Sequence, residues 1–427
     1  MRGSATIAVL ATVTGLLVGP GARAGSTQTC LGKTATLVAG AQQHDVEGTV
    51  GPDVIVALTG GVHVDALGGD DTICVTDGRV AAGDGNDAVL ATTPARHSTY
   101  ADLGPGDDSF VGGPGADTVD VGVVSSSPGG DASAGADVIL TGGGRDQVRS
   151  GGFTDSNGAP VEPNRDRVDL GNGTNSINLS LPPGSDADIS GVLGSKSSLQ
   201  FQSVGGDFTF DLANGQVMRD GLTVARIGSF RSLQLDLAGQ GSVHLLGTAH
   251  RDVVQTFAAQ VSANLAAGRD ILNVLFPSDI ASKNEIDGGP GRDSLGINTE
   301  STALTADLEA GWLLLDKPGT SIQFAMSGVE NIGAHVARAH IHGDGHRNVL
   351  VTTGCPARID GAGGRDVLVY NRDGNCGAVL TGGPGRDRLI GGIGNDRLIG
   401  GRGNDFANGW TGSADVCRVE VEKNCDR

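Results

Sequence analysis

Apolar and polar residues alternate over short stretches of the chain, which is the pattern of β-strands with one buried face. The stretches 208–212 and 233–237 each carry a large apolar residue at every second position. Helical spacing is weak throughout. In the stretch 253–265 the apolar residues are spaced as in a helix, but its valines fit strands equally well. The pattern therefore predicts an all-β protein.

A nine-residue repeat near the C-terminal end is the clearest signal in the sequence. Three copies follow one another without a gap, from Gly382 (GGPGRDRLI), Gly391 (GGIGNDRLI) and Gly400 (GGRGNDFAN). Each copy fits the pattern G-G-x-G-x-D-x-U-x, in which U is apolar. Positions seven to nine predict a short strand whose eighth residue points inward. The third copy has the small Ala407 at that position, which favours a terminal turn.

This repeat has the chemistry of a calcium site. Its glycines allow tight and left-handed turns that point carbonyl oxygens inward, and its sixth residue adds a carboxylate. Calcium prefers a shell of such oxygens. The predicted ligands and turn residues in this run are Asp387, Asp396, Asp405, Gly383, Gly385, Gly392, Gly394, Asn395, Gly401, Gly403 and Asn404.

Two nonapeptides make one coil, so alternate repeats stack directly. Stacking would bring Asp387 and Asp405 onto one edge and Asp396 onto the other, with each ion between successive coils. The run resembles the repeats-in-toxin, or haemolysin-type calcium-binding, family. The resemblance implies a right-handed parallel β-roll, here a β-solenoid with looped and degenerate repeats, that holds several calcium ions.

The same frame recurs outside the tandem run, where loops interrupt it. An Asp in a glycine-rich segment is also typical of an ordinary turn, which is the alternative interpretation at each isolated match. The further candidate ligands are Asp71, Asp87, Asp108, Asp117, Asp137, Asp146, Asp293 and Asp366.

The middle of the chain contains a long duplication. The segment from Phe210 (FDLANG) matches that from Ala306 (ADLEAG), and the segment from Gly247 (GTAHRDVV) matches that from Gly343 (GDGHRNVL) at the same offset. We therefore divide the chain into a signal peptide (1–24), an N-terminal calcium-binding solenoid segment (25–195), two copies of a β unit (196–299 and 300–409) and a C-terminal cap (410–427).

Composition and charge narrow the possible partners. The 427 residues include 72 glycines and only 3% aromatic residues, which suits a thin stacked architecture better than a large globular core. The formal net charge of −19 argues against nucleic acid as a partner and favours cations. Beyond calcium, we expect an extracellular or cell-surface polysaccharide or protein as the partner.

The N-terminus has the features of a secretory signal peptide. Arg2 precedes the apolar stretch 7–18, and residues 22–24 (Ala-Arg-Ala) form a cleavage site. The apolar stretch ends at Gly19, too early for a membrane span, and no later segment is long enough to be one. We therefore expect a secreted, extracellular protein.

Six cysteines follow the expected cleavage site, and an even number in an exported protein predicts disulfides. Proximity in the sequence favours three local pairs. These are Cys30 with Cys74, Cys355 with Cys376, and Cys417 with Cys425.

No catalytic motif stands out. The sequence has neither H-E-x-x-H nor G-x-S-x-G. His340, His342 and His346 could place imidazoles on one face, but the pattern fixes no carboxylate beside them, and a polar solvent-facing strand is the favoured interpretation. We expect a calcium-dependent structural or binding module that is not an enzyme. The alternatives are a lyase- or epimerase-like carbohydrate-active enzyme and an adhesin.

Overall fold

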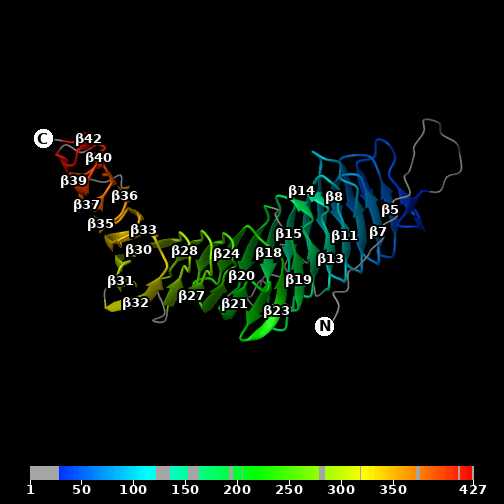
Figure 1. Cartoon of the computed structure of the whole chain (residues 1–427). Helices are drawn as coiled ribbons and strands as arrows, with labels where there is room; N and C mark the ends of the chain where they lie inside the picture. Colours follow the sequence, from blue (N-terminus) through cyan, green and yellow to red (C-terminus); the bar gives the residue numbers. More distant parts are fainter. Residues whose placement is uncertain are drawn as a thin grey trace.

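The computed structural model describes residues 28–121, 135–151, 163–191, 196–203, 205–277, 284–317, 319–371, 376–411 and 414–425. Within these ranges the secondary structure consists of β-strands, numbered β1 to β42, and includes no helix. The chain is a parallel β-solenoid, which runs from the blue N-terminal coils to the red C-terminal coils (Figure 1). The predicted all-β parallel β-roll is confirmed. The stretch 253–265 forms strands, β26 (Val253–Phe257) and β27 (Gln260–Asn264).

Successive strands alternate between two ladders, and most strands pair in parallel with the equivalent strand of the next coil. Ladder A contains β3 (Leu37–Val38), β5 (Val54–Ala57), β7 (Thr72–Val75), β9 (Ala88–Ala91), β11 (Ser109–Val111), β13 (Val138–Leu140), β16 (Arg167–Asp169), β19 (Ala187–Ser190), β21 (Asp207–Asp211), β22 (Gln216–Arg219), β23 (Leu222–Ile227), β25 (Ser242–Leu246), β27, β29 (Asn284–Asp287), β31 (Trp312–Lys317), β32 (Thr320–Ser327), β35 (Ala357–Asp360), β37 (Ala378–Gly385), β39 (Arg397–Gly403) and β41 (Val416–Arg418).

Ladder B lies opposite ladder A in each coil. It contains β4 (Asp45–Glu47), β6 (Val62–Asp65), β8 (Gly78–Ala81), β10 (Ser98–Asp102), β12 (Ala116–Asp120), β15 (Gln147–Ser150), β18 (Ser176–Ser180), β20 (Ser198–Gln202), β24 (Ser232–Asp236), β26, β28 (Ile271–Leu275), β34 (Val349–Thr352), β36 (Val367–Tyr370), β38 (Arg388–Ile390), β40 (Phe406–Asn408) and β42 (Val421–Lys423). The long strands β30 (Ser294–Asp307) and β33 (Asn331–His342) begin in ladder B and end in ladder A. Outside the ladders, β1 (Thr29–Cys30) pairs with β2 (Lys33–Thr34), and β14 (Gly143–Gly144) with β17 (Asn172–Gly173).

The core is a stack of inward-pointing side chains between the two ladders. Every second residue of a strand faces inward, and the parallel register places that residue above its equivalent in the next coil. In ladder A this produces a column of buried apolar residues through Ile55, Ile73, Val89, Phe110, Ile139 and Val168.

The internal duplication has a structural counterpart. In both copies ladder A contains a three-stranded antiparallel insertion, formed by β21, β22 and β23 in the first copy and by β30, β31 and β32 in the second. The first turn of each insertion is closed by an aspartate that accepts a backbone N–H three residues on: Asp211 from Asn214 at 3.0 Å and Asp307 from Ala310 at 2.8 Å. The expected boundary between residues 299 and 300 falls inside β30.

The C-terminal end differs from the prediction in one respect. The repeat that contains Ala407 was expected to be a terminal turn, but β41 and β42 form a further coil on top of it. The core side chain shrinks from Leu389 to Ala407, and the next residue in this column is the exposed Glu422. The stack of coils therefore extends one coil beyond the prediction, while the apolar column of ladder B ends at Ala407.

All three predicted disulfides are present: Cys30–Cys74, Cys355–Cys376 and Cys417–Cys425. The first joins β1 to β7, and the third lies in the last coil. The predicted signal peptide, residues 1–24, lies outside the described residues. In the part of the chain that the structure describes, no helix is long and apolar enough to cross a membrane.

Candidate calcium sites

Alternate sixth-position aspartates near the C-terminal end stack on one edge, in the turns that lead into ladder B. The backbone N–H of Asp366 donates to Oδ1 of Asp387 at 2.8 Å, and the N–H of Asp387 donates to Oδ1 of Asp405 at 2.8 Å. The N–H of Asp405 in turn donates to Oε2 of Glu420 at 2.9 Å. Each carboxylate thus fixes the backbone of the preceding coil. We call such a stack an aspartate ladder.

Asp396 lies on the opposite edge, as the nine-residue spacing predicts. Its Oδ1 accepts the N–H of Ala378 at 2.7 Å, and its Oδ2 accepts the N–H of Gly392 at 2.7 Å. Its own N–H donates to Oδ1 of Asp415 at 2.8 Å, so the short ladder on this edge continues into the last coil.

The N-terminal candidates also stack, although their spacing in the sequence is irregular. A ladder in the turns that lead into ladder A runs from Asp53 through Asp71, Asp87 and Asp108 to Asp137, with N–H to Oδ1 distances of 2.7–2.8 Å. The turns keep their register although the coils differ in length. Asp117 and Asp146 lie on the other edge, where the N–H of Asp117 donates to Asp146 at 3.0 Å.

The middle coils contain ladder residues that the sequence pattern missed. The N–H of Asp252 donates to Asp270 at 2.8 Å, that of Asp270 to the predicted ligand Asp293 at 2.7 Å, and that of Asp293 to Glu330 at 2.6 Å. Asp270 follows Gly-Arg, as Asp293, Asp366 and Asp387 do, so this shared tripeptide could have found it. Glu330 lies in Gly-Val-Glu-Asn, which offers no such signal.

Most of these carboxylates have an oxygen that is buried and has no hydrogen-bond partner. In the aspartate ladder Oδ1 accepts the hydrogen bond from the neighbouring coil, and Oδ2 stays buried. A buried charged oxygen without a partner is costly unless a cation neutralises it. The described residues with such an Oδ2 are Asp71, Asp87, Asp108, Asp146, Asp270, Asp293, Asp366, Asp387 and Asp405.

Burial raises the pKa of several ladder carboxyls. The pKa rises to about 7 at Asp87, to about 8 at Asp108 and to about 7 at Asp366, first because burial penalises the charged form and then because neighbouring aspartates repel it. At Asp53 burial acts in the same direction, but hydrogen bonds from Thr49 and Thr36 outweigh it and lower the pKa. The ladder therefore favours protons or a bound cation over bare carboxylates.

Glycine leaves the space that an ion between two coils would need. A Cβ at Gly382 would lie 2.5 Å from Oδ2 of Asp387 and 2.6 Å from the carbonyl oxygen of Gly400 in the next coil. At Gly361 it would lie 2.6 Å from Oδ2 of Asp366 and 2.7 Å from the carbonyl oxygen of Gly382. A carboxylate oxygen and a carbonyl oxygen therefore face the same open space in successive coils.

The other predicted turn residues surround these spaces. Positive φ angles at Gly383 (99°), Gly401 (111°) and Gly403 (153°) require glycine there. The glycines at repeat positions two and four point their carbonyl oxygens along the stack at the equivalent glycine of the next coil. Gly383 points at Gly401, and Gly385 points at Gly403. Gly392 donates its N–H to Asp396, and Gly394 packs on the backbone of residue 376. Asn395 and Asn404 are exposed.

These oxygens match the ligands that calcium prefers, carboxylates together with backbone carbonyls. Carboxylates alone would not form the site: within the described ranges no three His, Cys, Asp or Glu side chains are grouped so that they could hold a metal. A calcium ion here would need Oδ2 of a ladder aspartate and the glycine carbonyls of two coils.

Stacked turns with paired carboxylate and carbonyl oxygens define the class of the protein as a calcium-binding β-roll. The family model of the RTX calcium-binding nonapeptide repeat (4 copies) matches the chain at residues 102–123, 131–156 and 379–413. The chain therefore carries RTX calcium-binding repeats, as the resemblance implied. No curated protein matches the chain.

The histidine cluster has carboxylate neighbours that the sequence pattern did not indicate. Carboxylates do lie beside these residues: Nδ1 of His342 is 3.8 Å from Asp360, and Nδ1 of His346 is 3.4 Å from Asp344. His340 and His342 are on the outward side of β33, and His346 is exposed. The acids pair with individual histidines at the surface, and they build no shared metal site among the described residues.

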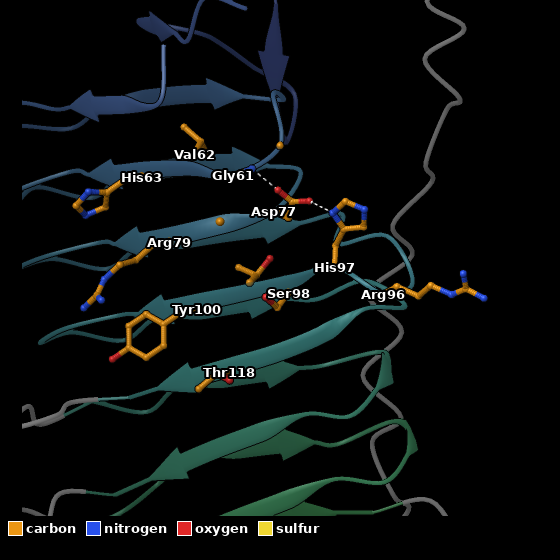
Figure 2. Close-up of a pocket in the computed structure, with 13 residues that line it drawn as sticks. Gly61, Val62, His63, Asp77, Arg79, Arg96, His97, Ser98, Tyr100 and Thr118 are labelled. Carbon is orange, nitrogen blue, oxygen red and sulfur yellow. Dashed lines mark hydrogen bonds and ion pairs between the residues drawn. The ribbon is translucent and has the colours of Figure 1, made fainter. Parts of the chain in front are cut away.

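A groove of about 1010 Å³ crosses the outer side of β6, β8, β10 and β12 (Figure 2). Asp77 is buried beside it, accepts the N–H of Gly61 and contacts Nδ1 of His97 at 2.5 Å. The other ring nitrogen of His97 points away from Asp77 (Figure 2). Sequence reasoning missed this pair because no motif links the two residues.

The same groove contains a fixed aromatic residue. The guanidinium of Arg79 lies 4.7 Å from the centre of the Tyr100 ring, and the Tyr100 hydroxyl donates to Asp120 at 2.7 Å. Burial, followed by this hydrogen bond, raises the pKa of Tyr100 to about 12. Tyr100 is therefore a neutral hydrogen-bonding group at physiological pH.

Proposed function

We propose that the protein is a secreted calcium-dependent structural or binding module, and that calcium met outside the cell completes the folding of its β-roll. The observation that carries this proposal is the row of buried, unpartnered Oδ2 atoms in successive coils. Bringing these carboxylates together costs free energy until a divalent ion bridges them, so the affinity for calcium is coupled to folding. Extracellular calcium modules often have dissociation constants of about 10⁻⁴–10⁻³ M, which suits such a switch.

Three disulfides and the signal-like residues 1–24 support secretion. Expression of the full chain in a bacterial host would test it. We expect a mature protein in the medium or periplasm whose N-terminal residue is Gly25. A full-length, uncleaved chain in the cytoplasm would contradict the proposal.

The calcium switch is tested by circular dichroism of the disulfide-bonded mature protein. Calcium is titrated into the millimolar range, with magnesium as the matched control, because magnesium dehydrates reluctantly and demands octahedral geometry. We expect a cooperative gain of β signal with calcium and little change with magnesium. A spectrum that is complete in chelator and unchanged by calcium would show that the repeats are only turns.

The proposed module has no catalytic step of its own. A carbohydrate-active enzyme is the second candidate, because the buried Asp77 orients the exposed imidazole of His97 beside an open groove, as a general base requires. Polysaccharides of neutral and acidic type would be incubated with the wild type and with His97→Gln. New chain ends that form with the wild type but not with the variant would favour the enzyme.

A further inference from the structure

Arginines form a line along the edge that carries the ladder Asp252 to Asp405. Each is the residue immediately before a ladder position, and the parallel register of the following strands places successive ones side by side. Val329 occupies the equivalent position between Arg292 and Arg347, in the middle of the line. The members of this arginine column are Arg251, Arg269, Arg292, Arg347, Arg365 and Arg386.

The internal duplication keeps the arginines. Arg251 corresponds to Arg347, Arg269 to Arg365 and Arg292 to Arg386. The carboxylate beside the first pair is not kept, because Asp252 of the first copy corresponds to Asn348 of the second. At this position both copies have the arginine, whereas only the first copy has the aspartate.

The column is electrostatically unfavourable by itself. Neighbouring strands lie about 4.8 Å apart, and like charges on directly opposite residues repel. The chain has 49 acidic residues for 30 basic ones, yet none of the six arginines makes an ion pair within 4.0 Å with a described residue. Five of them are exposed, and Arg292 is half-buried.

The ladder aspartates make no hydrogen bond or ion pair with the column, although the charges of Arg251 and Arg347 act to lower the pKa of Asp270 and Asp366. Oδ2 of Asp366 and of Asp387 is buried and accepts no hydrogen bond, although Arg365 and Arg386 are adjacent in the chain. The guanidinium groups therefore remain available at the surface for an external anion.

A groove of about 530 Å³ runs beside the second half of the column. Its walls include Arg347, Arg365 and Arg386, and a fourth guanidinium, that of Arg388, lies 5.5 Å from the centre of the Phe406 ring. The apolar side chains of Val367 and Val421 also line it. The groove thus combines a row of anion-binding groups with an apolar strip, and the ladder carboxylates Asp366, Asp387 and Asp405 also line it.

We propose that the arginine column binds a linear acidic polysaccharide, with its carboxylate or sulfate groups on successive guanidiniums. A polymer with an acid group on each sugar matches a row of cations at regular spacing, and the strip with Phe406 offers a surface for the apolar faces of sugar rings. The net charge of −19 and the carboxylates behind the column oppose any polyanion of similar charge to the same degree, so single-stranded DNA is the alternative that the test below separates.

Calcium would strengthen this binding, because an ion on the aspartate ladder adds positive charge beside the column. This part rests on the function proposed above. The binding itself rests only on the register of the folded coils, in which five of the six arginines are exposed.

The test is isothermal titration of the full mature protein with a galacturonic acid hexasaccharide in millimolar calcium. A neutral glucose hexasaccharide and a single-stranded DNA of similar charge are run beside it. The column variant is Arg347→Gln/Arg365→Gln/Arg386→Gln. The matched control is Arg338→Gln/Arg358→Gln/Arg397→Gln, which removes three exposed arginines of the same unit from the side of ladder A.

We expect the column variant to bind the acidic hexasaccharide at least about tenfold more weakly, since three exposed ion pairs of modest strength are lost. The control should stay within about twofold of the wild type. Equal affinity in the two variants, no binding by the wild type, or a preference for DNA would overturn the proposal. A calcium-induced change in circular dichroism that persists in the column variant would separate such a failure from a failure of the calcium switch.

Discussion

The backbone N–H of Asp387 donates to Oδ1 of Asp405, one coil further on, at 2.8 Å, and both carboxylates keep a buried Oδ2 without a partner. One oxygen of each aspartate therefore holds the coils in register while the other is free for an ion. The two roles can be separated by mutation, because an amide keeps the acceptor oxygen and loses the charge.

Asp387→Asn should therefore leave the ladder bond to Asp366 intact and weaken calcium binding. We expect the calcium midpoint to rise by about tenfold, the equivalent of about 1.4 kcal/mol. The exposed Asp65 on β6 provides the control: Asp65→Asn removes the same charge outside the aspartate ladders. Circular dichroism at increasing calcium measures both midpoints. Equal shifts in the two variants would mean that only net charge matters.

The raised pKa values make the calcium-free fold sensitive to pH. Asp87, Asp108 and Asp366 have folded-state pKa values of about 7, 8 and 7, well above the ordinary value of an aspartate, so the folded state holds more protons than the unfolded chain between pH 4 and 8. Stability in chelator should therefore fall as the pH rises through this window. Thermal melting with chelator at pH 5 and pH 8 checks the sign.

Calcium should reverse this trend, because it binds the ionised carboxylates and competes with the protons. The calcium midpoint is expected to fall as the pH rises from 6 to 8. A midpoint that does not change with pH would show that the carboxyls with raised pKa are not the ligands. Titrations at fixed ionic strength would exclude simple screening as the cause.

The repeat frame predicted much of this arrangement. The nine-residue step placed Asp387 and Asp405 on one edge and Asp396 on the other, because the period of the coil follows directly from the tandem run. Glu330 was missed because its coil carries the antiparallel insertion β31–β32, and a longer side chain without the glycine frame takes the place of aspartate.

Contacts between coils of unequal length could not be predicted. Asp77 meets His97 because the loop before β10 is longer than the turn before β8, and the sequence does not show where such a loop will lie. The disulfides were easier to predict, since each joins cysteines that are neighbours in the sequence.

The disulfides should contribute unequally to stability. Cys30–Cys74 closes a loop of 44 residues and Cys417–Cys425 one of 8. The loop-entropy model gives about 4 kcal/mol for the longer loop and about 2.5 kcal/mol for the shorter one. Cys30→Ser/Cys74→Ser should therefore lower the free energy of unfolding more than Cys417→Ser/Cys425→Ser does. Urea denaturation in saturating calcium measures the difference.

The apolar column between the ladders should account for stability that calcium cannot replace. Leu389 is fully buried between Leu368 and Ala407 of the neighbouring coils, so Leu389→Ala would leave a cavity that the fixed coil spacing cannot close. We expect a loss of about 2–5 kcal/mol in saturating calcium. Leu222→Ala is the control, because Leu222 is 72% exposed and its truncation should change stability by less than about 0.5 kcal/mol. A similar, small effect of both substitutions on urea denaturation would mean that the ions, rather than the core, hold the C-terminal coils together.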